Sequence, residues 1–261
     1  MANARNPGAL VPALTVFLAL VLLWAVGSRL WNRRRSPVPP ATIPTVTQPA
    51  GVGDTTAAAG RVAAAPGSAA AAARAAAREL IRREAAGTYI VETLEETDSV
   101  LRRWPDRLGR PVRVAVVRGA VRDWTDDYFR AANWAVSHWN IAGLPVRFAT
   151  GFDSATADIV IVWVDSLGGL REGRADLTWN GRGEMVRAVL LLAAHAPGGR
   201  RHTTPEMMTL ALHEFGHAIG LGHSTDSADV LFPINSTADL SARDRRTAGL
   251  LYSLPTGSVK N

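Results

Sequence analysis

The chain has 261 residues, 47% of them hydrophobic and 20% charged, proportions that exclude a collagen-like or wholly disordered protein. It contains no cysteine, which excludes disulfide frameworks, thiolate metal sites and cysteine nucleophiles. The formal net charge is +6, but residues 111–261 hold equal numbers of acidic and basic side chains, so we expect no nucleic-acid partner.

The first apolar segment is long enough to cross a membrane. Residues 8–28 carry no charged side chain, and roughly eighteen such residues are enough to span a hydrocarbon layer of ~30 Å. We therefore expect residues 1–30 to be a membrane anchor or signal segment, inserted through residues 9–28. The small residues Ala25-Val26-Gly27 leave a cleaved signal, and hence a secreted protein, as the alternative.

Two patterns indicate opposite orientations of this segment. Arg29 and the run Arg33–Arg35 follow the apolar stretch, and by the positive-inside rule they favour a cytoplasmic C-terminal part. The Pro- and Ala-rich composition that comes next is typical of a stalk that holds a domain away from a membrane. We expect a single-pass protein with an extracytoplasmic C-terminal domain, in which residues 31–87 form a linker that ends in an Ala-rich helix, Ser68–Ala86.

Residues 88–261 have the pattern of one mixed domain. Short runs that are alternating or rich in β-branched residues predict strands at Pro111–Arg118, Val146–Thr150, Asp158–Val164 and Val186–Ala194. Helices are predicted at Asp123–Asn140, Thr204–Leu221 and Ser241–Tyr252, the first from apolar residues at helical spacing. For the helix at Thr204–Leu221, Thr203 or Thr204 is the expected cap and Glu206 is placed for a capping box. This order predicts the α+β class.

The helix expected at Thr204–Leu221 and the turn after it carry the residues with catalytic chemistry. His213 and His217 are four residues apart, so their imidazoles leave the same helix face one turn apart and can converge on one metal ion. Gly220 stands where the helix must end, because glycine adopts positive φ freely. His223 then returns from the far side as a third ligand, which leaves one coordination position open.

Three neutral histidines are typical ligands of a catalytic zinc ion. Such an ion lowers the pKa of a bound water and polarises a carbonyl group. Glu214 follows His213 directly and is placed to take a proton from that water and pass it to a leaving amine. We therefore expect Zn²⁺ as the cofactor, with His213, His217 and His223 as ligands and Glu214 as the general base.

The segment resembles the metzincin metalloproteases, whose signature is HExxHxxGxxH, and Ser224 after the third histidine resembles the matrixin branch. The similarity covers about residues 110–252, strongly at the zinc motif and weakly elsewhere. It implies a twisted, mostly parallel sheet packed on helices, and zinc-dependent cleavage of peptide or protein substrates. It also implies a cleft beside an edge strand, which we assign to Val186–Ala194, where an extended substrate would add as a further strand.

The chain departs from the matrixin pattern at three points. Leu231 occupies the place of a methionine that lies in a turn below the zinc, and Asn235 replaces a tyrosine that lines the pocket after the cleavage point. The absence of cysteine excludes latency through a propeptide thiol on the zinc. A second hypothesis follows from Leu231 and Asn235, namely a catalytically silent zinc-containing module that binds peptides and is tethered to the membrane.

The remaining polar residues that draw attention have simpler interpretations. We expect ordinary helix or loop positions rather than metal ligation for His138, His195 and His202. Strand-end capping or solvation is expected for Asp158, Asp165 and Asp176. Ser224 is more readily a hydrogen-bonding neighbour of the metal site than a nucleophile, since no free base adjoins it in the sequence.

Overall fold

The computed structural model describes residues 66–106, 109–234 and 237–260. All of them lie in one compact unit, Arg61–Asn261. The expected membrane segment, residues 9–28, and most of the linker lie outside the described residues. Among the described helices, none combines the length and the apolar character that a membrane span requires.

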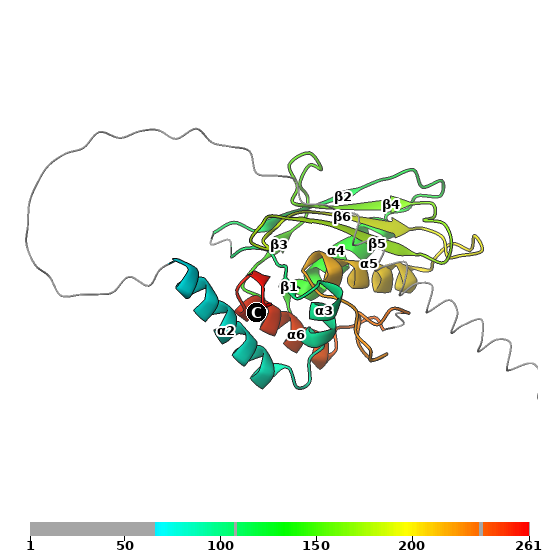
Figure 1. Ribbon diagram of the computed structural model, residues 1–261. Helices are drawn as coiled ribbons and strands as arrows, with labels where there is room; N and C mark the ends of the chain where they lie inside the picture. Colours follow the sequence, from blue (N-terminus) through cyan, green and yellow to red (C-terminus); the bar gives the residue numbers. More distant parts are fainter. Residues whose placement is uncertain (1–65, 107–108, 235–236, 261) are drawn as a thin grey trace, which may run out of the picture. The chain divides into compact units, whose positions relative to one another are not determined.

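A five-stranded sheet forms one layer of the fold (Figure 1). Its order is β3-β2-β4-β6-β5, in which β2 pairs in parallel with β3 and β4, β4 pairs in parallel with β6, and β5 is antiparallel to β6. The mostly parallel sheet and the α+β class are therefore confirmed. The strands span Val112–Val117 (β2), Phe148–Ala149 (β3), Ile159–Val164 (β4), Gly173–Trp179 (β5) and Met185–Ala193 (β6).

The assignment of Val186–Ala194 as the edge strand is wrong. That segment is strand β6, and it pairs on one side with β4 and on the other with β5, so both of its edges are covered. The edge strand next to β6 is Gly173–Trp179, which the sequence pattern did not predict as a strand at all. Its residues GRADLTW include a glycine and two charged side chains and are nearly all partly exposed, so no apolar alternation marks them.

Helices α4 (Asp127–Asn140) and α5 (Thr204–Ala218) pack against each other beside the sheet (Figure 1). The fully buried Trp139 of α4 packs at this contact, and its indole N–H donates to the backbone carbonyl of Leu212 at 2.9 Å. Both helices were expected from their apolar spacing. Burying an aromatic side chain of this size contributes about 2–3 kcal/mol from the removal of apolar surface from water.

The remaining described elements include three helices and a two-stranded sheet. They are α2 (Pro66–Glu84), α3 (Ile90–Glu96), β1 (Val100–Leu101), α6 (Ala242–Ser253) and β7 (Gly257–Ser258). Strand β1 pairs with β7 in antiparallel fashion, so residues 100 and 101 are joined to the last described residues. The helix expected at Ser68–Ala86 begins two residues earlier and ends two residues earlier. Its Ala77 is only 3% exposed and belongs to the main core.

Candidate metal centre

Helix α5 begins with the capping arrangement that the sequence predicts. Thr203 is the N-cap, its hydroxyl accepts from the backbone N–H of Glu206, and the Glu206 carboxylate accepts from the backbone N–H of Thr203. Hydrogen bonds from Arg200 and Thr203 hold the pKa of Glu206 far below its usual range. These contacts satisfy the first N–H groups of the helix and fix where its histidines lie.

The end of α5 is held by side chains from distant parts of the chain. The indole N–H of Trp104 donates to the carbonyl of Ala218 at 2.8 Å, and the hydroxyl of Tyr252 donates to the carbonyl of Ile219 at 3.1 Å. Carbonyls in the last turn of a helix have no partner within the helix, so these buried donors replace water there. The last turn of α5 is thereby fixed from outside the helix.

Gly220 ends the helix in the way that its position suggests. Its φ is +110°, and a β-carbon on this residue would lie 2.0 Å from the backbone carbonyl oxygen of Arg102. Both the backbone conformation and the space therefore require glycine. The N–H of Leu221 turns back to the carbonyl of Gly216 at 3.1 Å, and the chain reverses toward the face that carries the histidines.

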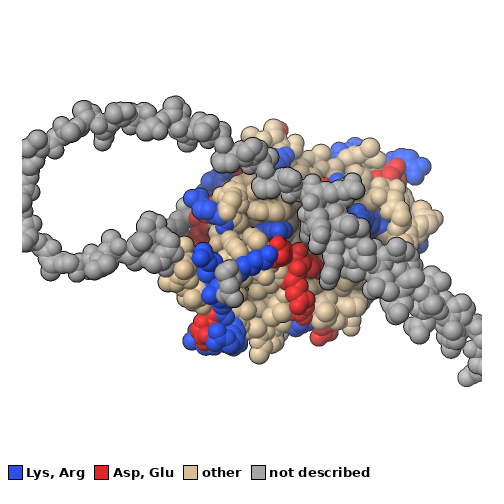
Figure 2. Space-filling model, in the orientation of Figure 1, with Lys and Arg blue, Asp and Glu red and all other residues tan. Residues whose placement is uncertain are grey.

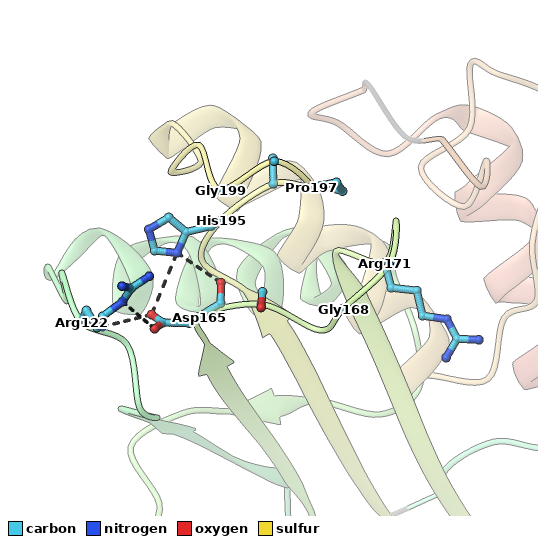
Figure 3. A pocket seen from close by; sticks show the side chains of 11 residues that line it. Arg122, Asp165, Gly168, Arg171, His195, Pro197 and Gly199 are labelled. Carbon is cyan, nitrogen blue, oxygen red and sulfur yellow. Dashed lines mark hydrogen bonds and ion pairs between the residues drawn. The ribbon is translucent and has the colours of Figure 1, made fainter. Parts of the chain in front are cut away.

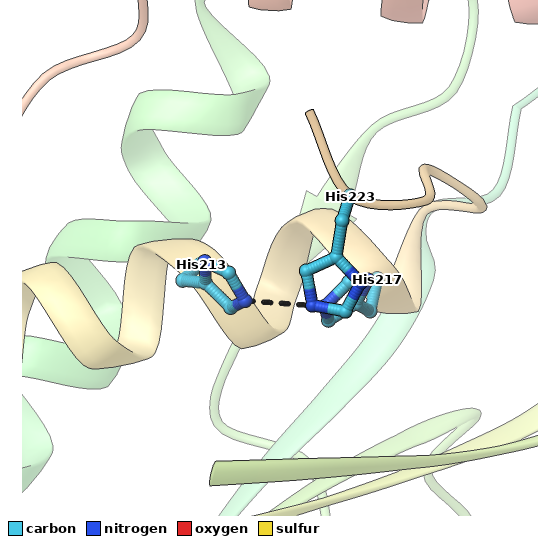
Figure 4. Close-up of side chains that lie close together, drawn as sticks. All are labelled: His213, His217 and His223. Carbon is cyan, nitrogen blue, oxygen red and sulfur yellow. Dashed lines mark hydrogen bonds between the residues drawn. The ribbon is translucent and has the colours of Figure 1, made fainter. Parts of the chain in front are cut away.

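The three histidines come together as expected (Figure 4). His213 and His217 extend from α5, and His223 reaches the same place from the following turn. Their ligand atoms all lie within 4.8 Å of one another, and the Nε2 atoms of His213 and His217 are 3.2 Å apart. Two nitrogens that bind one tetrahedral zinc ion at ~2.0–2.1 Å are about 3.3 Å apart, so this spacing fits such an ion.

The other ring nitrogens show which atoms face the metal position. The Nδ1 atoms of His213 and His217 lie 2.7 Å and 2.9 Å from the carbonyl oxygens of Val230 and Leu221. A carbonyl only accepts, so each Nδ1 carries the proton and each Nε2 presents a lone pair. Two facing lone pairs repel unless a cation lies between them, and the chemistry of this donor set therefore fits Zn²⁺.

Burial keeps His213 and His217 neutral, and the neutral imidazole is the form that binds metal. Burial, with a further contribution from the neighbouring His223, lowers the pKa of His213 to about 4. The same causes hold the pKa of His217 well below its usual value. Both imidazoles are neutral at pH 7, and a metal ion does not have to displace a proton from either.

Glu214 lies against the edge strand. Its side chain is buried, and a β-carbon built on Gly173 would lie 2.0 Å from Glu214 Oε1. The first residue of β5 therefore has to be glycine for the carboxylate to occupy this place. Burial raises the pKa of Glu214 to about 8 when no metal ion is present, and a nearby dication would favour the charged form.

The turn below the site contains the residue that replaces the expected methionine. Leu231 is fully buried, and a β-carbon on Gly216 would lie 2.6 Å from its Cδ2 atom, so Leu231 packs directly against α5 between the two histidine turns. The preceding residue, Val230, holds His213 through its carbonyl. Leucine therefore fills the space under the metal helix. The other departure, Asn235, lies outside the described residues.

Ser224 has the hydrogen-bonding role that was expected of it. Its buried hydroxyl donates to Asp229, whose carboxylate also accepts from Arg243 at 2.8 Å and from the hydroxyl of Ser241 at 2.6 Å. This network joins the turn after the third ligand to the N-terminus of α6. Because Arg243 and Ser241 also donate to the carboxylate of Asp229, the contact with Ser224 is part of a structural network.

Sequence reasoning missed one residue at the site, Glu96 of α3. Its Oε1 lies 3.0 Å from Nδ1 of His223, and its Oε2 accepts from the backbone N–H of His223 at 3.1 Å. Burial raises the pKa of Glu96, but the hydrogen bonds from His223 outweigh this and the net shift is downward. More than 120 residues separate the two in the chain, so no spacing rule links them.

A second group of possible ligands lies at the far ends of β4 and β6, where Asp123, Asp165 and His195 approach one another. Figure 3 shows Arg122 and His195 pointing at Asp165 beside a cavity of about 250 Å³. Arg122 donates to Asp165 at 2.9 Å, and Arg201 pairs with Asp123 at 3.4 Å. Guanidinium groups already neutralise both carboxylates, so this group is an ion-pair network.

The remaining histidines are not placed at the metal position. His138 lies against the ring of Trp134, with ring centroids 3.7 Å apart, on the partly exposed face of α4. His202 is buried just before α5, between Glu172 and Glu206. Asp158 accepts from the backbone N–H of Arg113 at 2.8 Å and thereby ties β4 to β2.

Comparison with known proteins identifies one family. The matrixin family model matches residues 175–253, which include most of β5, all of β6, the three histidines and Glu214. No curated protein matches the sequence. Two solved structures of myroilysin match with TM-scores of 0.40, at 14% and 13% identity; they cover 59% and 57% of this chain and 97% and 85% of theirs. The matrixin match confirms, over residues 175–253, the resemblance inferred from the zinc motif.

Proposed function

We propose that this protein is a zinc-dependent endopeptidase. The observation that carries the proposal is the convergence of three imidazole Nε2 atoms whose Nδ1 atoms are each held by an acceptor, with a buried carboxylate on the same helix. Histidines that bind no metal have no need of neutral rings with lone pairs that face one another, and three protein ligands with an open fourth position are typical of a catalytic rather than a structural zinc site. The matrixin match over the same residues supports the assignment.

The chain's own residues supply orientation and proton transfer. A zinc ion held by His213, His217 and His223 would lower the pKa of a water molecule toward 7 and polarise the carbonyl of the scissile peptide. The Glu214 carboxylate takes a proton from the attacking water as its oxygen bonds to the carbonyl carbon. Glu214 then delivers that proton to the amide nitrogen as the C–N bond breaks, so charge and atoms balance.

The edge strand β5 supplies the binding surface for an extended peptide. One side of β5 pairs with β6, and the other side carries backbone groups that an added strand can use. Because Gly173 at the start of β5 contacts Glu214, a strand added there passes the base and the histidines. The matrixin match implies peptide or protein substrates, in accord with this surface.

Substitution of Glu214 by alanine tests the mechanism. We expect zinc content to persist, because Glu214 is not a ligand, while cleavage of casein or a quenched fluorescent peptide falls by orders of magnitude. Chelation should abolish wild-type cleavage. If the variant and the chelated protein cleave as well as the untreated wild type, the mechanism is wrong. A wild type that binds zinc and peptides without cleaving them would favour the silent-module hypothesis.

We further propose that residues 9–28 anchor the protein in a membrane as a single span and that the peptidase domain lies outside the cytoplasm. The uncharged apolar stretch and the Pro-rich segment after it support this arrangement. Protease treatment of intact cells should remove the C-terminal domain from the membrane fraction. A domain that becomes sensitive only after cell lysis would contradict this orientation.

A further inference from the structure

Helix α3 contacts the turn that carries the third histidine through three of its seven residues. Glu96 accepts from both the ring and the backbone of His223, and Thr93 accepts from the backbone N–H of Gly222 at 3.1 Å. One turn earlier, Glu92 accepts from the hydroxyl of Thr225 at 3.3 Å. Positions 92, 93 and 96 share one helix face, so the whole face lies along residues 222–225.

Gly222 in this turn allows α3 to approach closely. A β-carbon on Gly222 would lie 2.9 Å from both the Cα atom of Thr93 and Oε2 of Glu96. Any larger residue at this position would push α3 away from the turn. Gly222 therefore serves the close approach of α3, whereas Gly220 serves the end of α5.

The three ligands differ in what holds them. His213 and His217 lie on a capped helix, and their Nδ1 atoms are held by neutral backbone carbonyls, those of Val230 and Leu221. His223 lies in an irregular turn, and the acceptor at its Nδ1 is a carboxylate from another element. The ligand with the least support from its own backbone is thus the one that receives a charged acceptor.

We propose that Glu96 is the positioning residue for the third zinc ligand, an inference that rests on the proposed function. Its carboxylate fixes the proton of His223 on Nδ1, turns Nε2 toward the metal position and makes that nitrogen a better donor. A carboxylate beside a metal-binding histidine also partly offsets the charge of the ion. Figure 2 shows acidic side chains gathered where Figure 1 places α3, which carries Glu92, Glu95 and Glu96.

The expected size of the effect follows from exposure. The side chain of Glu96 is 40% exposed, so water competes for its hydrogen bonds. Loss of such a partner typically weakens metal binding by 10- to 100-fold, and a half-exposed carboxylate belongs at the lower end. We therefore expect Glu96→Ala to weaken zinc binding by about tenfold. Glu96→Gln keeps one acceptor oxygen and should show a smaller loss.

The experiment measures zinc affinity of the full chain, purified in detergent, by competition with a chromophoric chelator. Glu95→Gln is the matched control, because Glu95 is exposed on the same short helix and has no hydrogen bond among the described residues. We expect affinity to fall in the order wild type and Glu95→Gln, then Glu96→Gln, then Glu96→Ala. Equal affinities of all four proteins would overturn the proposal.

A spectroscopic measurement separates positioning from a general loss of folding. The visible absorption of bound Co²⁺ reports ligand geometry, so Glu96→Gln should alter the d–d bands while its thermal unfolding without metal matches that of Glu95→Gln. Unchanged bands, or a loss of affinity that only mirrors destabilisation, would contradict the role of Glu96. A wild type that binds no zinc would instead overturn the proposed function itself.

Discussion

Among the described residues, two groups of side chains have ligand atoms close enough to hold a metal ion, and their surroundings give them opposite characters. In His213, His217 and His223, each Nδ1 atom contacts an acceptor and the Nε2 atoms face one another. At Asp123, Asp165 and His195, two arginines already form ion pairs with the carboxylates. Hydrogen bonds from Arg122, its backbone N–H first, lower the pKa of Asp165, as expected of a carboxylate with a cationic partner.

The difference teaches that proximity of ligand atoms does not define a metal site. In the first group, the acceptors at Nδ1 leave the Nε2 lone pairs facing one another. In the second group, arginine side chains compensate the charges of the carboxylates within the protein. The second group lies at the ends of β4 and β6, where it joins α4 to the loop before α5.

The largest effect is expected from removal of a ligand. His217→Ala leaves two imidazoles and should abolish stoichiometric zinc, measured by plasma mass spectrometry after dialysis. His195→Ala serves as the comparison and should retain one zinc per chain, because its group binds no metal. Two zinc ions per wild-type chain, with one lost in His195→Ala, would contradict the contrast between the groups.

A large effect on catalysis is expected from Gly173→Ala. The added β-carbon would overlap the carboxylate of Glu214, so that side chain must move away from the histidines. Peptidase activity should fall by about 10²- to 10³-fold, within the range for a displaced general base, while zinc stays bound. Gly181→Ala is the control, because its β-carbon would meet nothing within 4 Å. Comparable activity of the two variants would show that Glu214 tolerates the displacement.

A moderate effect is expected from pH on the metal-free protein. Burial raises the pKa of Glu214 from 4.5 to about 8, so between these values the folded state binds a proton that the unfolded state has released. Stability from this group is full below pH 4.5 and falls as pH rises toward 8. His213, with a pKa lowered to about 4, acts in the opposite direction but only up to about pH 6.5.

The pH range above 6.5 therefore isolates Glu214. The wild type should lose about 1–2 kcal/mol between pH 6.5 and 8 relative to Glu214→Gln, measured by urea unfolding with chelator present. A constant difference between the two proteins across this range would show that Glu214 is already ionised at pH 6.5.

The smallest effect is expected from Leu231→Met. The two side chains have similar volumes, and such exchanges in a core usually cost less than about 1.5 kcal/mol. Because Leu231 already packs against Gly216, methionine should leave zinc affinity and activity within about twofold. A large gain in activity would show that leucine leaves the space beside Gly216 of α5 poorly filled.

The sequence predicted what depends on local spacing. His213, His217, Gly220 and His223 lie within eleven residues, and helical geometry places them without knowledge of the rest of the chain. The capping box of Thr203 and Glu206 is equally local and was confirmed. The strands predicted from runs of apolar and β-branched residues were also found, three of them (β2, β4 and β6) in the interior of the sheet and β3 at one edge.

What escaped prediction depends on contacts between distant segments. The edge strand β5 carries polar residues because one of its sides faces solvent, so its pattern resembles a loop and β6 was taken for the edge. Gly173 looks like any turn glycine until Glu214 is placed beside it. Glu96 belongs to a short helix whose neighbour in space follows more than 120 residues later.

The pairing of β1 with β7 has a consequence for the last described residues. Val100 lies opposite Ser258, and Arg78 of α2 donates to the carbonyl of Val259, so early segments of the described unit lie beside its last residues. Removal of residues 257–260 would therefore take away the strand partner of β1 and the backbone acceptor of Arg78 at the same time.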